Sequence, residues 1–398
     1  GLSTITFDAS LTGATIALGG TDLVLDTDVE IQGLGAGALT IDAEGSSRVF
    51  HIKPGTSAII SDLALTRGHG DLGGAITIWG AGAELMLNDV TISDSSAQCG
   101  GAIAVGGGAQ ATLNGATTLD GNTATGSASS MGGAVYAYGV GTVLDIDPTV
   151  LVQNNHADWR GGGMALYYGA QAILDASIFG AGNTASAFPS LFTASDSSLT
   201  FLSLAVSSTG DGNDGDYSAG NLTLREAIAL AKWEPGLTTI TFDASLSGAT
   251  LALAGTELVL DTDVDIQGLG AAALTIDAGD SSRLFRIKPG TSAGISDLTL
   301  TCGYGDVGGA ISISGAGANL TLTDVAVTDS TAQFGGAICA GDGALVILHG
   351  ATDLDGNTAT GSASSMGGAI YAYGAGTVVD IDPTVLVQNN HADWRGGG

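Results

Sequence analysis

Hydrophobic and polar residues alternate in short runs along this chain, and turn-forming residues close each run. The segment 85–92, with the sequence LMLNDVTI, is one example, and it is followed by Ser, Asp and Ser. Alternation with a period of two over four to eight residues predicts a β-strand with one buried face. Clusters of Gly, Asn, Asp and Ser between such runs predict turns. The pattern therefore predicts an all-β protein built of many short strands.

A Gly-Gly-Ala-aliphatic element marks a repeat of strands and turns. It begins at Gly73, Gly100 and Gly132, and a Gly-Gly-Gly variant begins at Gly161, so the spacings are 27, 32 and 29 residues. These intervals leave no room for crossover helices, and a propeller blade needs about 40 residues or more. They suit one coil of a parallel β-solenoid, in which coils stack about 4.8 Å apart. We therefore expect inward aliphatic side chains to form a narrow core and Gly to occupy the corners.

A second, longer repeat covers most of the chain. Gly1 pairs with Gly236 and Gly163 with Gly398, an offset of 235 residues without a gap, and 37 of the 163 paired positions differ. A register held over this length indicates duplication of a whole unit. The chain begins without Met and ends at Gly396-Gly397-Gly398, where the first copy continues. We therefore expect it to be a window from a longer tandem array.

Residues 187–235 interrupt the pattern. Phe188-Pro189-Ser190 is typical of a link, 199–204 predicts a strand, and 211–216 is an acidic, Gly-rich loop. Thr223 and Glu226 form a capping box for a helix from Leu224 to Trp233. Its apolar face is predicted to consist of Leu224, Ala227, Ile228 and Ala231, and Pro235 is expected to end it. Because a solenoid needs a lid over its first coil, we expect this helix to cap the second repeat.

These boundaries predict four segments. Residues 1–186 are expected to form the solenoid of repeat 1 without its N-terminal cap, and 187–198 a link. Residues 199–235 are expected to contain the capping strand, acidic loop and helix of repeat 2. Residues 236–398 are expected to form the truncated solenoid of repeat 2.

Composition narrows the class of protein. The chain has 40 acidic and 10 basic residues and a net charge of −30. Binding to nucleic acid or to an anionic membrane surface requires clustered Lys and Arg, so neither is expected. No uninterrupted apolar stretch approaches the ~18 residues of a membrane span, so we expect no membrane insertion in this segment. The three Cys are not repeated between the copies, which predicts no disulfide framework.

Two sequence features resemble known families. The Gly-Gly-Ala-aliphatic elements that follow Asn-x-Ala triplets resemble those of bacterial polymorphic outer-membrane and adhesin-type β-helix proteins. The segment from Leu222 to Ile228, followed by Thr239-Ile240-Thr241-Phe242, resembles the CSLREA-type motif of bacterial surface proteins, with Leu222 in place of the family's Cys. The chain also lacks the Phe of the adhesin family's second short motif. The resemblance implies a right-handed parallel β-helix that is secreted and displayed outside the cell.

Three groups of residues are candidate sites. The Asn-x-Ala asparagines are expected to occupy left-handed corners and to hydrogen-bond along the stack, forming a structural ladder; ordinary exposed turns are the alternative. Trp159 and Trp394, each beside an Arg, either stack on a sugar or a neighbouring subunit, or pack at a corner. The loop residues Asp211, Asn213, Asp214 and Asp216 partly match a calcium nonapeptide, so the loop either binds calcium or is a solvated acidic turn. The expected ladder consists of Asn122, Asn155, Asn183, Asn357 and Asn390.

The function we expect is structural. The chain is predicted to be a non-catalytic repeat unit of an extracellular bacterial surface fibre or long adhesin, and its expected partners are copies of itself. A carbohydrate-binding or adhesive module that recognises glycans or a neighbouring cell surface is the first alternative. A polysaccharide lyase or glycoside hydrolase is the second, because carboxylate pairs recur at Asp26/Asp28, Asp145/Asp147, Asp261/Asp263 and Asp380/Asp382.

Overall fold

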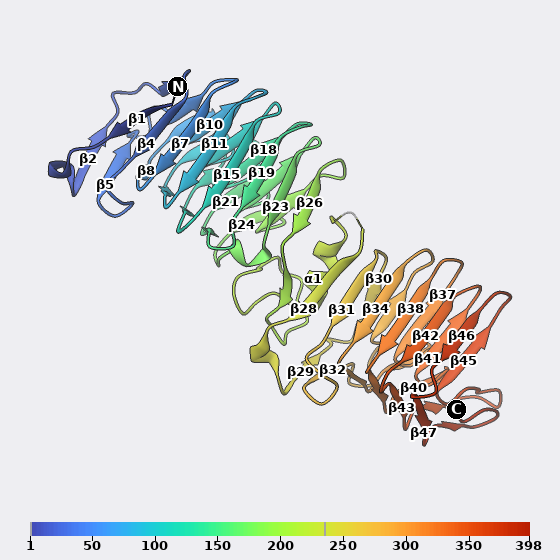
Figure 1. Cartoon of the computed structure of the whole chain (residues 1–398). Helices are drawn as coiled ribbons and strands as arrows, with labels where there is room; N and C mark the ends of the chain where they lie inside the picture. The colour runs from blue at the N-terminus through green and yellow to red at the C-terminus, as the bar shows by residue number, and fades with distance from the viewer. Residues whose placement is uncertain (1, 235) are drawn as a thin grey trace. The chain divides into compact units, whose positions relative to one another are not determined.

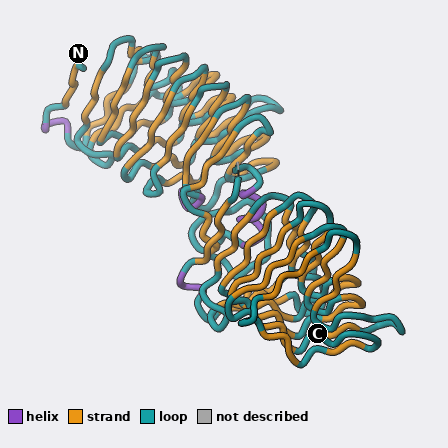
Figure 2. The backbone as a smooth tube through the Cα atoms, turned by 45° about the vertical axis from the view of Figure 1, so that its right-hand side comes forward, coloured by secondary structure: helices purple, strands orange, loops and turns teal. Residues whose placement is uncertain are grey.

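The computed structural model describes residues 2–234 and 236–398, and it consists of parallel β-coils (Figure 1). The chain divides into two compact units. Unit 1 is Gly1–Leu202 with Asp214–Ala219, and unit 2 is Ser203–Asn213 with Gly220–Gly398. In each unit the strands stack into four parallel sheets, which we call faces 1 to 4 in the order that the chain visits them. Figure 2 shows the strands of successive coils lying side by side within each unit. The predicted β-solenoid is confirmed.

In unit 1, the four faces contain eight, six, five and seven strands. Face 1 consists of β1 (Ser3–Thr6), β4 (Val29–Gln32), β7 (Ser57–Ser61), β11 (Glu84–Asn88), β15 (Gln110–Asn114), β19 (Val143–Ile146), β23 (Gln171–Leu174) and β26 (Ser198–Phe201). Face 2 consists of β2 (Ala14–Ala17), β5 (Leu39–Asp42), β8 (Ala64–Thr66), β12 (Thr91–Ser93), β16 (Thr118–Asp120) and β20 (Leu151–Gln153). Face 3 consists of β9 (His69–Leu72), β13 (Ser96–Cys99), β17 (Thr123–Ala124), β21 (His156–Arg160) and β24 (Thr184–Ala187). Face 4 consists of β3 (Leu23–Leu25), β6 (Phe50–Ile52), β10 (Ile76–Trp79), β14 (Ile103–Gly106), β18 (Val135–Tyr138), β22 (Met164–Tyr167) and β25 (Leu191–Thr193).

In unit 2, the corresponding faces contain seven, six, four and five strands. Face 1 consists of β27 (Leu204–Val206), β28 (Thr238–Phe242), β31 (Val264–Gln267), β34 (Ser292–Ser296), β38 (Asn319–Thr323), β42 (Leu345–His349) and β46 (Val378–Ile381). Face 2 consists of β29 (Ala249–Ala252), β32 (Leu274–Asp277), β35 (Thr299–Thr301), β39 (Ala326–Thr328), β43 (Asp353–Asp355) and β47 (Leu386–Gln388). Face 3 consists of β36 (Tyr304–Val307), β40 (Thr331–Phe334), β44 (Thr358–Ala359) and β48 (His391–Ala392). Face 4 consists of β30 (Leu258–Leu260), β33 (Phe285–Ile287), β37 (Ile311–Ser314), β41 (Ile338–Gly341) and β45 (Ile370–Tyr373).

Short helical segments complete the two units. Three are 3₁₀ turns at Ala9–Leu11, Ala176–Ile178 and Ala244–Leu246, each begun by an Asp whose carboxylate accepts a backbone N–H. The α-helix α1 spans Leu224–Ala231, begins with the predicted capping box and buries the predicted apolar face. It ends two residues before the expected Trp233, and Pro235 lies outside the described residues. No described helix is long and apolar enough to cross a membrane.

The core of each unit is a stack of identical strand positions. On face 4 of unit 1, Ile103 lies beside Ile76 and Val135 in the adjacent coils, and all three side chains are fully buried. The glycine doublets allow coils to approach closely, because a Cβ on Gly133 would lie 2.0 Å from the Gly162 carbonyl oxygen. Gly132, with a φ of +65°, supplies the left-handed corner. The glycines therefore set the corner, and the aliphatic residues that follow enter the core.

Residues 187–198 differ from the expected link. Within them β25 pairs in parallel with β22, and β26 then pairs with β23, so the stack of unit 1 extends to Phe201. Phe188-Pro189-Ser190 takes the place that a glycine triplet has in the preceding coil: Phe188 has a φ of +56°, and the Pro189 carbonyl accepts from the Gly163 N–H at 3.0 Å. The single strand expected at 199–204 is two strands, β26 in unit 1 and β27 in unit 2. The prediction missed this coil because its corner is made without glycine.

Candidate functional site

A column of buried polar side chains runs along unit 1 between faces 2 and 3. The side-chain oxygen of Asn155 accepts from the Asn122 backbone N–H at 2.9 Å, and that of Asn183 accepts from the Asn155 N–H at 3.1 Å. The Asn155 amide also donates to the Leu119 carbonyl at 2.9 Å. Asn122 and Asn155 are fully buried, and Ser95 continues the column. These hydrogen bonds satisfy backbone groups that the corners leave without a partner.

The same column is present in unit 2. The Asn357 oxygen accepts from the Ser330 N–H at 3.1 Å, and the Asn390 oxygen accepts from the Asn357 N–H at 2.8 Å. The expected left-handed conformation is wrong by one residue, because the positive φ belongs to the preceding position. There Asn154 has a φ of +54° and Asn389 a φ of +53°. The turn residue therefore supplies the corner, and the following Asn turns its side chain into the stack.

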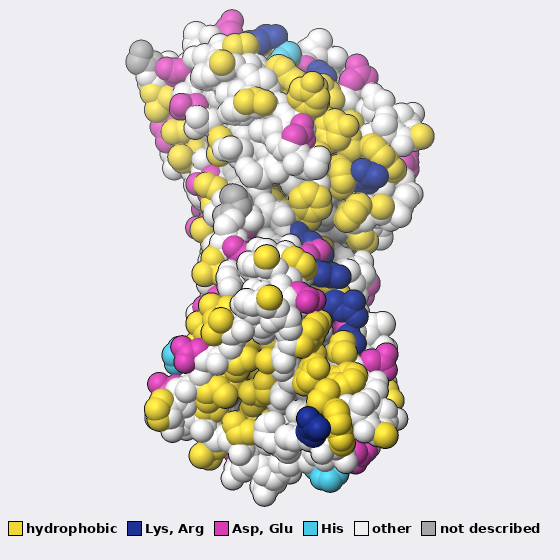
Figure 3. Space-filling view, turned by 90° about the vertical axis from the view of Figure 1, so that its right-hand side faces the viewer, with side chains coloured by type: hydrophobic (Ala, Val, Ile, Leu, Met, Phe, Trp, Pro, Cys, Tyr) yellow, Lys and Arg dark blue, Asp and Glu magenta, His cyan; other side chains and the backbone are white. Residues whose placement is uncertain are grey.

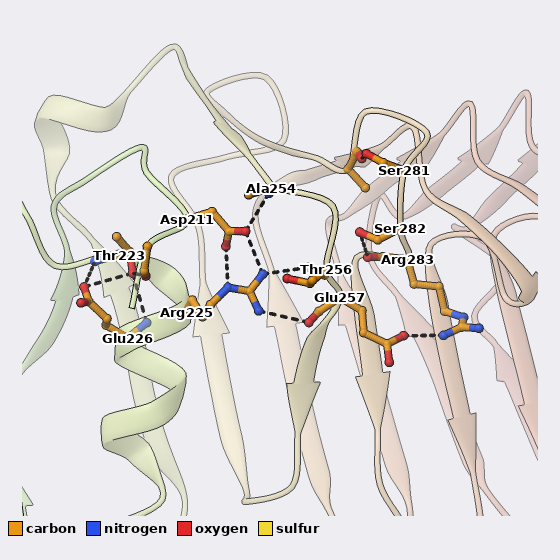
Figure 4. Close-up of polar contacts among 12 residues, drawn as sticks. Asp211, Thr223, Arg225, Glu226, Ala254, Thr256, Glu257, Ser281, Ser282 and Arg283 are labelled. Atoms are coloured by element: carbon orange, nitrogen blue, oxygen red, sulfur yellow. Dashed lines mark hydrogen bonds and ion pairs between the residues drawn. The ribbon is translucent and has the colours of Figure 1, made fainter. Parts of the chain in front are cut away.

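The acidic loop of unit 2 is tied to helix α1 and to the first coil. Figure 4 shows Arg225 between the Asp211 carboxylate and the backbone of Thr256 and Glu257. The Arg225 guanidinium donates to both Asp211 oxygens at 2.8 Å and to the Thr256 carbonyl at 2.8 Å. Asp211 also accepts from the Ala254 N–H at 2.7 Å, and its side chain is only 5% exposed. Arg225 therefore fastens the loop, the helix and the coil together.

The Leu-Arg-Glu-Ala segment thus has a clear physical explanation. Arg225 binds the acidic loop, while Glu226 accepts from the Thr223 N–H at 3.0 Å and Thr223 accepts from the Glu226 N–H at 3.1 Å. The Thr223 hydroxyl also contacts the Gly212 carbonyl at 2.8 Å. Neighbouring charge pairs extend the network, because Glu257 pairs with Arg283 and, at 2.7 Å, with Arg286. Arg225 and Glu257 line a small hollow of about 190 Å³ beside α1.

The predicted calcium ligands have other contacts. Both oxygens of Asp211 are taken by protein donors, as described, and Asn213 lies at the hollow beside Arg225. In unit 1, the Asp214 carboxylate accepts from the Asp216 N–H and the Asp216 carboxylate from the Ser218 N–H, both at 3.0 Å. Among the described residues no group of three or more His, Cys, Asp or Glu side chains is arranged to hold a metal ion. Calcium binding stays a prediction.

Trp159 belongs to an apolar cluster on the outer surface of unit 1. The Arg160 guanidinium lies 4.2 Å from its ring centre and 4.6 Å from that of Phe192. Trp159 is partly buried, and the buried residues of this cluster include Cys99 and Met131. In unit 2, Arg395 lies 4.2 Å from the Trp394 ring, which is 48% exposed. In both units one face of the indole is therefore covered by an arginine.

A row of aromatic side chains on face 4 of unit 1 was not predicted. It comprises Trp79, Tyr138, Tyr167 and Tyr168, which we call the aromatic platform. Ring centroids lie 5.8 Å apart between Trp79 and Tyr138 and 5.4 Å apart between Tyr138 and Tyr168. Figure 3 shows apolar side chains gathered in patches on the surface of the molecule. The sequence contains a signal for this row. Trp79, Tyr138 and Tyr167 each follow the first glycine of a doublet by six residues.

The recurrent carboxylate pairs lie within or beside strands of face 1, and their members are exposed or half-buried. Asp147 and Asp382 each accept from the hydroxyl and the backbone N–H two residues on, and these hydrogen bonds lower the pKa of both carboxyl groups. Asp28 and Asp263 each accept a backbone N–H from the next coil. A general acid needs a raised pKa, so Asp147 and Asp382 are poor candidates for that role.

No model of a known protein family matches the chain, and no curated protein matches it.

Proposed function

We propose that this chain is a non-catalytic structural repeat unit of a bacterial surface fibre or long adhesin, displayed outside the cell. The observation that carries the proposal is the continuous, in-register stacking of coils within each unit. On face 1 of unit 1, eight successive strands are hydrogen-bonded in one parallel sheet. At about 4.8 Å for each coil, seven intervals give a rod segment of about 34 Å. Such a segment resists bending because each coil is bonded to the next along its length.

The surface chemistry supports an extended, self-repelling structural element. The net charge of −30 keeps solvated segments apart and soluble. The near-identity of the two copies supports a tandem array, in which the expected partners are other copies along the same fibre. The resemblance to adhesin-type β-helix proteins and to the CSLREA-type motif supports placement at a cell surface. The capping box, together with the hydrogen bonds from Arg225 to Asp211 and to the first coil, supports a role for α1 as the lid of a repeat.

Antibody labelling of native cells tests this proposal. Antibodies against this segment are applied to intact cells, and the labelled material is examined by electron microscopy after negative staining. The expected result is gold label along thin surface fibres on unpermeabilised cells. Label that is found only after permeabilisation would contradict the surface location. Depolymerisation of a polysaccharide by the purified chain, lost when a carboxylate pair is replaced by amides, would show that it is an enzyme instead.

A further inference from the structure

The aromatic platform is produced by strand register. On face 4 of unit 1, Trp79 pairs with Gly106, Gly106 with Tyr138, and Tyr138 with Tyr167. All four are outward positions at the ends of adjacent strands. A Cβ on Gly106 would lie 2.3 Å from the Trp79 ring, so the indole lies across that coil and reaches Tyr138. Glycine at this position therefore makes the row of rings continuous.

Tyr168 occupies a corner at which the neighbouring coils use glycine. The equivalent residues Gly80, Gly107 and Gly139 have φ values of +112°, +65° and +97°, and Tyr168 has a φ of +60°. A bulky side chain is disfavoured in this left-handed region. Its ring is 58% exposed, so little burial offsets the strain. Strain held at an exposed side chain points to a role in binding.

The rings share an orientation. The Tyr168 and Tyr138 planes differ by 8°, and the planes of Trp79 and Tyr138 differ by 23°. Tyr167 also stacks on Tyr138, with 6.3 Å between the centroids. The rings of the platform carry two kinds of chemical group, apolar C–H groups and tyrosine hydroxyl groups. The result is a row of four uncharged rings, three of which carry a hydroxyl group that can hydrogen-bond.

We propose that the aromatic platform binds the sugar rings of a neutral polysaccharide chain. The axial C–H bonds of a pyranose contact the electron-rich faces of aromatic rings, and its hydroxyl groups hydrogen-bond to tyrosine. None of the four side chains is charged, so a polyanionic glycan gains no ion pair here. The net charge of −30 opposes docking of either a polyanion or a second copy of the chain. This activity goes beyond the structural role and does not depend on it.

Two substitutions test the platform in the full chain. Tyr168→Gly installs the residue found at the equivalent corner of the three preceding coils and removes the exposed ring. Trp79→Ser installs the residue that unit 2 has in this place, Ser314. The control is Tyr304→Ala, which removes an exposed tyrosine, 53% accessible, from face 3 of unit 2. Binding to soluble xylan, mannan and hydroxyethyl cellulose is measured by affinity electrophoresis, with dextran sulfate as the anionic comparison.

We expect at least one neutral polysaccharide to retard the wild-type chain and dextran sulfate not to do so. Tyr168→Gly and Trp79→Ser should each weaken that binding by about thirtyfold, the smallest loss that defines an interface hot spot, while Tyr304→Ala leaves it unchanged. Tyr168→Gly should not lower the melting temperature, because it relieves a left-handed residue. Retardation by dextran sulfate alone, or by no polymer, would overturn the proposal. So would binding that both platform variants retain, or a dimer of the wild-type chain that Tyr168→Gly dissociates.

Discussion

Replacing Asn155 with Ala removes one member of the buried polar column. The Asn122 N–H loses its acceptor at 2.9 Å, and the Leu119 and Gln153 carbonyls lose donors at 2.9 Å and 2.7 Å. A buried N–H left without a partner costs about 1–3 kcal/mol. The weakened carbonyl contacts and the small cavity bring the expected loss of folding free energy to about 3 kcal/mol. A loss of 1 kcal/mol lowers the melting temperature of a unit of this size by roughly 3 °C, so the melting temperature should fall by about 9 °C.

Hydrogen-exchange mass spectrometry, together with thermal unfolding, measures this effect and shows its location. Exchange should accelerate in the coils around residues 119–157, while peptides of unit 2 serve as the internal reference. Asn154→Gly is the matched control, because Asn154 is exposed and has a φ of +54°, which glycine adopts without strain. Asn390→Ala should cost less, because Asn390 is only half-buried. If Asn155→Ala loses no more stability than Asn154→Gly, the column does not stabilise the stack.

The remaining predictions concern charged residues. Arg225→Met should destabilise unit 2 by about 2 kcal/mol in chemical denaturation, because Asp211 would keep a nearly buried charge without its main partner; adding Asp211→Asn to that variant should recover part of the loss. Millimolar calcium should not raise the melting temperature through Asp211, whose oxygens are already bonded to protein donors, and a calcium-dependent rise lost in Asp211→Asn would contradict this. Hydrogen bonds from Arg67 lower the pKa of Asp42 below the unfolded value of about 3.9. That pair therefore stabilises unit 1 above about pH 4, and its contribution disappears as the pH falls through the folded-state pKa. Acid unfolding of unit 1 should be less steep in Arg67→Cys, which installs the residue of unit 2.

The features that the backbone requires were predictable from sequence. A Cβ on Gly133 would lie 2.0 Å from the Gly162 carbonyl oxygen, which excludes any side chain, so glycine doublets mark the coils. A buried Asn must hydrogen-bond on both sides, so Asn recurs in the turn between faces 2 and 3 of successive coils. The capping box of α1 is local, since Thr223 and Glu226 are three residues apart. For each of these features, the geometry restricts the residue type to one or two choices.

Other features were missed because their residue types have several uses. Phe188 adopts the left-handed corner conformation that glycine has in other coils, and the Pro189 carbonyl accepts the hydrogen bond from the Gly163 N–H. The final coil of unit 1 therefore has no glycine doublet in its sequence. Asp211 was predicted as a calcium ligand because carboxylates bind metal ions, but a carboxylate also pairs with a guanidinium group, and this pairing was not foreseen. Its partner Arg225 is 14 residues away in sequence, and only the folded loop brings them together. Pairing across such a loop is not visible in a pattern of single residues.

The sequence differences between the two units change the chemistry of the surface more than the stability of the fold. Where inward positions differ between the copies, one aliphatic residue replaces another, as at Val105 and Ala340 or Leu144 and Val379. At outward positions the chemical character itself changes, and Trp79 becomes Ser314 without altering the pairing of face 4. In a solenoid an outward side chain touches few atoms of the core, so its replacement costs little folding free energy. Consecutive repeats of this kind can therefore share one scaffold and still present different binding surfaces along it.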